Sequence, residues 1–82
     1  VELYEVRLHP QGALRSQAHF AGTREFVAVE QGSVRVESGQ DAADLQAGDS
    51  ATFRADVPHA IVNIGREEAR FLLVDVFRPA GR

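Results

Sequence analysis

The feature that most constrains the fold of this chain is a series of short segments in which apolar and polar residues alternate, each ending at a turn signal. The run Val34-Arg35-Val36-Glu37 is the clearest example, because a period of two places its valines on one face and its charges on the other. No stretch of ten or more residues has apolar side chains at helical spacing. The pattern predicts an all-β chain with little or no helix. The expected strands are 2–8, 13–20, 26–30, 33–38, 43–46, 50–54, 59–63 and 70–77.

Strands joined by such short turns predict a small antiparallel β-barrel or sandwich. Gln31-Gly32 has the composition of a short hairpin connection, and 48–63 is interpreted as a further hairpin that reverses at 55–58. A barrel of about eight strands has an interior that side chains fill or that holds one small ligand. We expect a single domain over 1–78 and a C-terminal tail over 79–82.

One strand predicts a carboxylate inside the fold. If Glu25 points inward, Val27 and Val29 do so too, and Val34 and Val36 lie opposite them across the following turn. A buried carboxylate without a partner is costly, so other polar groups are expected beside it.

The strand 59–63 is the second place where polar side chains share a face with apolar ones. His59, Ile61 and Asn63 lie on one face by parity. Asn63 either supports His59 or a ligand, or it ties its own turn through backbone hydrogen bonds. On the preceding strand, Phe53 is a candidate aromatic wall of a pocket. Arg54 is a candidate partner for an anionic effector.

The composition excludes several classes of protein. Nine arginines, no lysine and twelve acidic residues give a net charge of -3, with acids interspersed among the arginines, so direct nucleic-acid contact by this chain is not expected. The absence of cysteine excludes disulfides, thiolate zinc sites and a cysteine nucleophile. No apolar run approaches the roughly 20 residues of a membrane span, and the first residues lack the pattern of a signal peptide, so we expect no membrane partner and a cytoplasmic location.

The spacing of Gly48, His59 and Asn63 resembles the second motif of the cupin family, which has a proline and a glycine where this chain has Arg54 and Asp56. The stretch 19–32 resembles the first cupin motif. In that stretch His19 stands at the first histidine position, Ala21 at the second, and Glu25 precedes Gly32 by the family's interval. The resemblance covers nearly the whole chain and implies a double-stranded β-helix of the jelly-roll type.

The resemblance also implies a metal site, because the usual cupin site holds a divalent ion with three histidines and a glutamate. Of that set this chain retains His19, Glu25 and His59. Two imidazoles and a carboxylate can hold zinc, iron(II), nickel or manganese. Imidazole–carboxylate hydrogen bonds would also satisfy the three residues without an ion. Both alternatives are open, and the sequence implies no firm cofactor.

The phrases AGTREF and FRADVPH resemble the cupin domain at the C-terminus of bacterial helix-turn-helix regulators of the Xre type. This resemblance implies a small-molecule effector in the barrel, a homodimer, and an N-terminal DNA-binding domain in a longer parent protein. The chain itself contains no helix-turn-helix sequence. The alternative function is a small metal-dependent enzyme, a dioxygenase or isomerase, with its ion at His19, Glu25 and His59. No separate acid–base pair is evident for such chemistry, so no catalytic residue is assigned.

Overall fold

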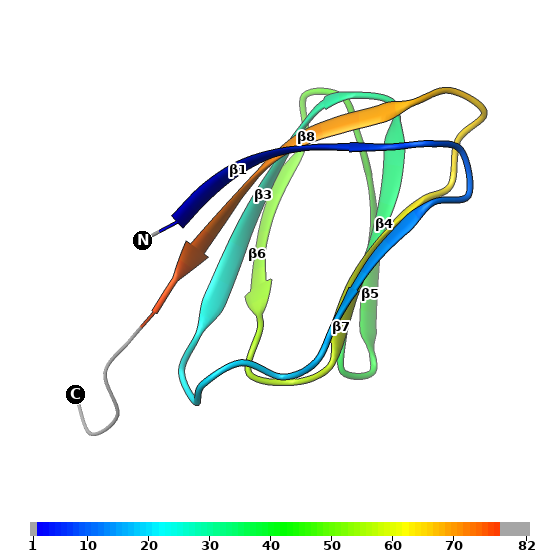
Figure 1. Ribbon diagram of the computed structural model, residues 1–82. Helices are drawn as coiled ribbons and strands as arrows, with labels where there is room; N and C mark the ends of the chain where they lie inside the picture. Colours follow the sequence, from blue (N-terminus) through cyan, green and yellow to red (C-terminus); the bar gives the residue numbers. More distant parts are fainter. Residues whose placement is uncertain (1, 78–82) are drawn as a thin grey trace.

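The computed structural model describes residues 2–77, which form two antiparallel sheets of four strands each. The strand order is β1-β8-β3-β6 in the first sheet and β2-β7-β4-β5 in the second, and the two sheets face each other (Figure 1). The described part of the chain contains no helix. The strands are β1 (Glu2–Leu8), β2 (Ala13–Ser16), β3 (Arg24–Gln31), β4 (Ser33–Ser38), β5 (Asp41–Gln46), β6 (Ser50–Arg54), β7 (His59–Asn63) and β8 (Ala69–Val76).

The core lies between the sheets and follows the predicted alternation. Val27 and Val29 of β3 are buried, as are Val34 and Val36 of β4 in the facing sheet. Glu25 shares the inner face of β3 and is only 4% exposed, so its predicted inward direction is confirmed. The all-β, two-sheet fold is likewise confirmed. Within residues 2–77 no ladder joins the two sheets, so a closed hydrogen-bonded barrel is not formed there.

The predicted hairpins at Gln31-Gly32 and at 55–58 are wrong. Each connection carries the chain from one sheet to the other, and β4–β5 is the only pair of consecutive strands that is hydrogen-bonded among the described residues. Gly32 lies at the first of these crossings. Its φ is +83°, which favours glycine, and a Cβ there would lie 3.0 Å from the Glu68 oxygen, so a side chain would crowd the β7–β8 connection.

Two strand boundaries differ from the prediction in ways that bear on the site. β2 ends at Ser16, so His19 lies in the loop before β3 rather than on a strand. β3 begins at Arg24, which places Glu25 near its start. The predicted tail, 79–82, lies outside the described residues.

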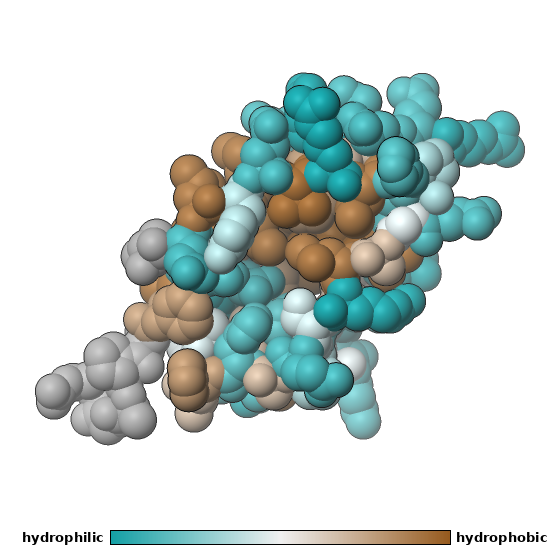
Figure 2. Space-filling model, in the orientation of Figure 1, coloured by the Kyte–Doolittle hydropathy of each residue, from teal (hydrophilic) through white to brown (hydrophobic). Residues whose placement is uncertain are grey.

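The facing sheets leave two openings, one on each side of the core. One lies between the edge strands β1 and β2, and the other between the edge strands β6 and β5. Figure 2 shows apolar side chains gathered in a hollow at the centre of the face where β1 and β2 lie. None of the described residues forms a helix that is long and apolar enough to cross a membrane.

Candidate functional site

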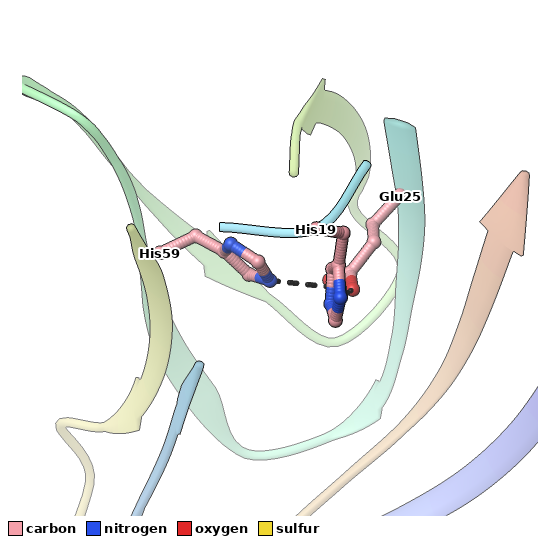
Figure 3. A group of neighbouring side chains, drawn as sticks. All are labelled: His19, Glu25 and His59. Atoms are coloured by element: carbon pink, nitrogen blue, oxygen red, sulfur yellow. Dashed lines mark ion pairs between the residues drawn. The ribbon is translucent and has the colours of Figure 1, made fainter. Parts of the chain in front are cut away.

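Three side chains from distant parts of the chain meet between the sheets. His19 comes from the β2–β3 loop, Glu25 from β3 and His59 from β7 (Figure 3). The Glu25 Oε2 atom lies 3.5 Å from His19 Nε2 and 3.4 Å from His59 Nε2. One donor atom from each residue lies within 4.8 Å of the others. The structure therefore brings together the three residues that the sequence named as a metal or hydrogen-bonded set.

His59 is held rigidly at the inner end of this cluster. Its Nδ1 lies 2.7 Å from the Val57 carbonyl oxygen, a contact in which only the protonated nitrogen can donate. The Phe53 ring packs against the imidazole with a centroid separation of 6.0 Å. These contacts direct Nε2 toward Glu25, and this buried atom has no hydrogen-bond partner within residues 2–77.

His19 occupies the outer side of the cluster. Its backbone N–H donates to the Ala55 carbonyl at 2.8 Å, which fixes a loop that has no strand pairing of its own. The ring lies 5.0 Å from the His59 ring, and the side chain is 35% exposed. His19 is thus the member of the cluster that solvent or a ligand reaches first.

Glu25 also has an acidic neighbour that could not be identified as such from the sequence interpretation. Asp75 of β8 is its cross-strand partner and is 7% exposed. Burial raises the pKa of the Glu25 carboxyl to about 8, and the neighbouring carboxyl of Asp75 adds to the rise. The sequence did indicate that Asp75 faces inward, because Asp75 has the same parity as Phe71 and Leu73 in the most apolar strand.

A pocket of about 470 Å³ opens between β1 and β2 and reaches this cluster. Its apolar wall includes Val6, Leu14 and Leu73. Its polar end is formed by His19, Glu25 and Asp75. A pocket that combines an apolar wall with a few convergent polar groups is typical of a small-molecule site.

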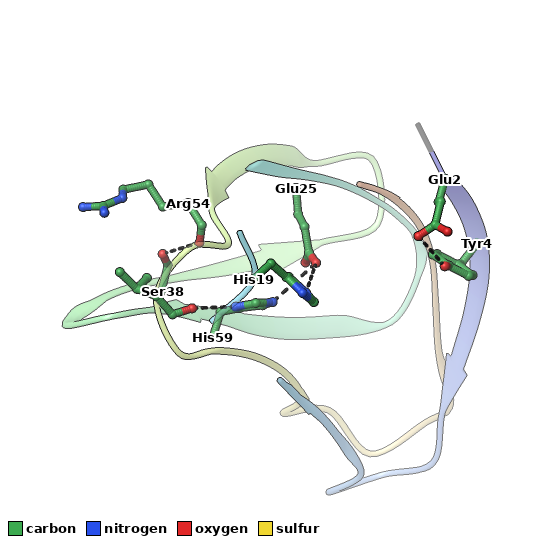
Figure 4. Close-up of polar contacts among 8 residues, drawn as sticks. Glu2, Tyr4, His19, Glu25, Ser38, Arg54 and His59 are labelled. Atoms are coloured by element: carbon green, nitrogen blue, oxygen red, sulfur yellow. Dashed lines mark hydrogen bonds and ion pairs between the residues drawn. The ribbon is translucent and has the colours of Figure 1, made fainter. Parts of the chain in front are cut away.

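The structure separates Arg54 from this cluster. Figure 4 shows its side chain pointing away from His19, Glu25 and His59. Its Nε donates to Asp56 at 2.9 Å, and it lines the other opening, between β5 and β6. Phe53 is a wall of that second opening and the support of His59 at the same time.

Asn63 lies on the inner face of β7 but serves the turn that follows it. Its Nδ2 donates to the carbonyl oxygens of Leu8 at 3.0 Å and Glu67 at 2.8 Å, and its Oδ1 accepts from the Gly65 N–H at 2.8 Å. The side chain is buried, and these bonds use its donors and its acceptor. Of the two roles considered for Asn63, the structure therefore shows the one that ties the turn.

The cluster fits a divalent ion in donor type, and the two separations from Glu25 suit one as well. In a tetrahedral site with bonds of about 2.1 Å, neighbouring ligand atoms lie about 3.4 Å apart, close to the separations of Glu25 from His19 and from His59. The contact between Nδ1 and Val57 orients the His59 ring as metal-binding histidines require. Three protein ligands would leave further coordination positions open to water or a ligand.

A two-sheet β-fold with an interior imidazole–carboxylate cluster defines the chain as a small domain of the double-stranded β-helix class. Residues 4–75 match the Cupin_2 family, described as the cupin domain. The chain therefore belongs to the cupin family, and the resemblance inferred from its motifs is confirmed. No curated protein sequence has significant similarity to the chain.

Several solved structures share this fold. An HTH_3 family transcriptional regulator from Vibrio cholerae is 25% identical, with a TM-score of 0.86 over 94% of this chain and 43% of its own. The chain thus spans less than half the length of that regulator. The Cupin_2 domain of an XRE family transcriptional regulator from Enterobacter cloacae has the same TM-score at 23% identity, over 94% of this chain and 81% of its own. A cupin described as a sugar phosphate isomerase from Silicibacter pomeroyi is 31% identical, with a TM-score of 0.72 over 94% of this chain and 50% of its own.

Proposed function

We propose that this chain is the small-molecule effector-binding and dimerisation domain of a bacterial transcriptional regulator. The observation that carries the proposal is the pocket between β1 and β2, which leads from solvent to a buried imidazole–carboxylate cluster. The similarity of the chain to the Vibrio cholerae regulator supports the assignment to this class of protein. DNA contact would belong to a separate helix-turn-helix domain, and the site of action would be the cytoplasm.

The geometry suggests how binding in the pocket could be transmitted. The pocket is lined by β1 and β8 of one sheet and by β2 of the other, together with the loop that carries His19. A ligand that contacts all of these elements favours the arrangement of the sheets that fits it. The ligand shifts the equilibrium between two states of the regulator only by its difference in affinity for them.

The outer face of the first sheet supports dimerisation. Leu3 of β1 is 66% exposed and Val76 of β8 is 39% exposed, and the half-buried side chains of Leu72 and Val74 lie beside them on the same face. An apolar sheet face on a domain this small suits a two-fold contact with a second copy. Replacing Leu3 by glutamate is expected to convert a dimer into a monomer in sedimentation velocity. A monomeric wild-type domain would contradict this part of the proposal.

The regulator assignment has a direct test in the genome. The coding sequence upstream of Val1 is expected to encode a helix-turn-helix domain in the same reading frame. A gene that begins at Val1, or one with a different upstream domain, would overturn the assignment.

The alternative function is a small metal-dependent enzyme, a dioxygenase or isomerase, and the fit of His19, Glu25 and His59 to a divalent ion favours it. A bound ion would supply Lewis acidity and open coordination positions. The chain's own residues would hold the ion through two imidazoles and a carboxylate, with His59 fixed by Val57.

Metal binding is tested on protein that has been stripped with a chelator and then titrated with zinc, nickel, manganese or iron(II). We expect a higher melting temperature with at least one ion, and we expect His59→Ala to remove that effect. His9→Ala is the matched control, because His9 is exposed and lies outside the cluster. If no ion stabilises the wild-type protein, the enzyme alternative fails.

A further inference from the structure

Asp75 is the one buried side chain of the pocket that is left with an unused acceptor. Its Oδ1 is buried, and no hydrogen bond from the described residues reaches it. The residue is 93% buried, lines the pocket between β1 and β2, and lies across from Glu25. A buried acceptor without a donor costs free energy, so this position is suited to a donor that arrives with a ligand.

The charges around Asp75 are mainly negative. Glu2 is its cross-strand partner on β1 and accepts a hydrogen bond from the Tyr4 hydroxyl at 2.8 Å. Glu5 and Arg7 lie at the rim and pair with each other at 3.8 Å, and both side chains are more than half exposed. That pair adds no net charge. Glu25, with its pKa raised to about 8, retains its proton up to that pH, so among the described residues Glu2 and Asp75 give the polar end its negative charge.

Two arginines that could attract an anion are on the opposite side of the domain. Arg24 and Arg54 are cross-strand partners on β3 and β6, and both line the opening between β5 and β6. An anionic ligand in the β1–β2 pocket would approach buried carboxyl groups, and among the described residues that line the pocket the only arginine is Arg7, which is paired with Glu5.

We propose that the β1–β2 pocket binds an organic cation, an ammonium group on an apolar body, with the ammonium donating to Asp75 and the body lying along Val6, Leu14 and Leu73. This inference deepens the proposed function and rests on it. Three features carry it: the unpartnered Oδ1 of Asp75, the acidic neighbours and the apolar wall. A volume of about 470 Å³ accommodates a small amine of this kind.

The test compares three probes that share one apolar body and differ in the sign of the polar end: n-hexylammonium, 1-hexanol and hexanoate. Binding is measured by calorimetry and by the shift in melting temperature, at matched ionic strength and with a chelator present, so that the amine cannot act through a bound metal. We expect hexylammonium to bind at least about tenfold more tightly than hexanoate, with hexanol between them.

The matched variants are Asp75→Asn, which keeps the shape of the side chain and removes its charge, and Asp41→Asn, which removes an exposed charge at the opposite opening. We expect Asp75→Asn to weaken hexylammonium binding at least about tenfold, and Asp41→Asn to leave it unchanged. Far-ultraviolet circular dichroism of each variant checks folding. If Asp75→Asn does not fold, the contrast among the three probes on the wild-type protein decides.

The possible outcomes separate this inference from the proposed function. Preferential binding of hexanoate would overturn the cationic ligand and leave the effector pocket standing. Equal binding of all three probes, or an unchanged affinity for hexylammonium in Asp75→Asn, would also overturn it. If none of the probes binds, the inference fails, and the regulator assignment is still judged by the sequence upstream of Val1.

Discussion

The opening between β1 and β2 and the opening between β5 and β6 are bounded by the same two sheets, yet they differ in how their charges are neutralised. In the first, Glu25 and Asp75 are buried side by side, and Glu25 also lies next to the imidazoles of His19 and His59. In the second, a cavity of about 380 Å³, Arg54 forms an ion pair with Asp56 in which the arginine is largely exposed. Among the described residues, the first opening thus has two buried carboxyl groups beside an imidazole cluster, whereas the charges of the second form an ion pair.

This contrast has a physical consequence for the two sites. An exposed ion pair contributes little to stability and is easily replaced by water, so the β5–β6 opening needs no ligand to satisfy it. Buried carboxyl groups are costly unless they are protonated or paired. A metal ion or a ligand that binds at the β1–β2 opening can therefore offset the free-energy cost of burying these carboxyl groups.

The largest expected effect is on the pH dependence of stability, measured on metal-free protein. The pKa of Glu25 is raised to about 8 in the folded chain, from an ordinary value of 4.5. Between these values the folded protein retains a proton that the unfolded chain has released, so the free energy of unfolding falls as the pH rises. The loss is as much as about 5 kcal/mol, since each unit of pKa shift corresponds to about 1.4 kcal/mol. Denaturant unfolding at a series of pH values measures it.

Replacing Glu25 by glutamine is expected to flatten this profile between pH 5 and 8, because the glutamine does not titrate. Asp56, beside the other opening, is expected to give stability the opposite dependence on pH. The hydrogen bond from Arg54 holds the pKa of the Asp56 carboxyl below the usual range. The contribution of Asp56 to stability is therefore present at neutral pH and is lost as the pH falls through the folded-state pKa. A wild-type profile that rises between pH 5 and 8 would contradict the comparison.

A smaller effect is expected from Asn63→Ala, which tests whether the β7–β8 turn is independent of both openings. The substitution removes three hydrogen bonds in a buried site and should cost about 3 kcal/mol of stability. Because Asn63 makes its contacts within the turn and with β1, metal binding by the cluster should persist in the folded variant. Loss of metal binding without loss of stability would show instead that Asn63 supports the site.

The smallest effect is expected from Arg54→Gln. The ion pair with Asp56 is exposed on the arginine side, so the melting temperature should stay close to that of the wild type. Binding of hexylammonium and of metal ions should be unaffected, since Arg54 points away from the cluster. A marked change in either binding curve would couple the two openings and remove the distinction between them.

Much of the inner face could be predicted from the sequence, because alternation is a local property of an extended backbone. The burial of Val27, Val29 and Glu25 follows from parity alone. The pairing of strands could not be predicted in the same way. Turn signals at Gln31-Gly32 mark where the chain reverses, but they do not say which strand it then joins. The close approach of Gly32 to Glu68 and Ala69 at the crossing involves residues far apart in the sequence.

The sequence by itself determined which side chains face inward on each strand and that a glutamate and a histidine would be among them, because backbone pleating fixes side-chain direction residue by residue. Only the tertiary structure decided that His19 reaches Glu25 from a loop anchored at Ala55, and that Asp75 lies opposite Glu25. These neighbours come from elements separated by many residues. Their proximity depends on the register of β3 with β8 and on the packing of the two sheets, which no local pattern encodes.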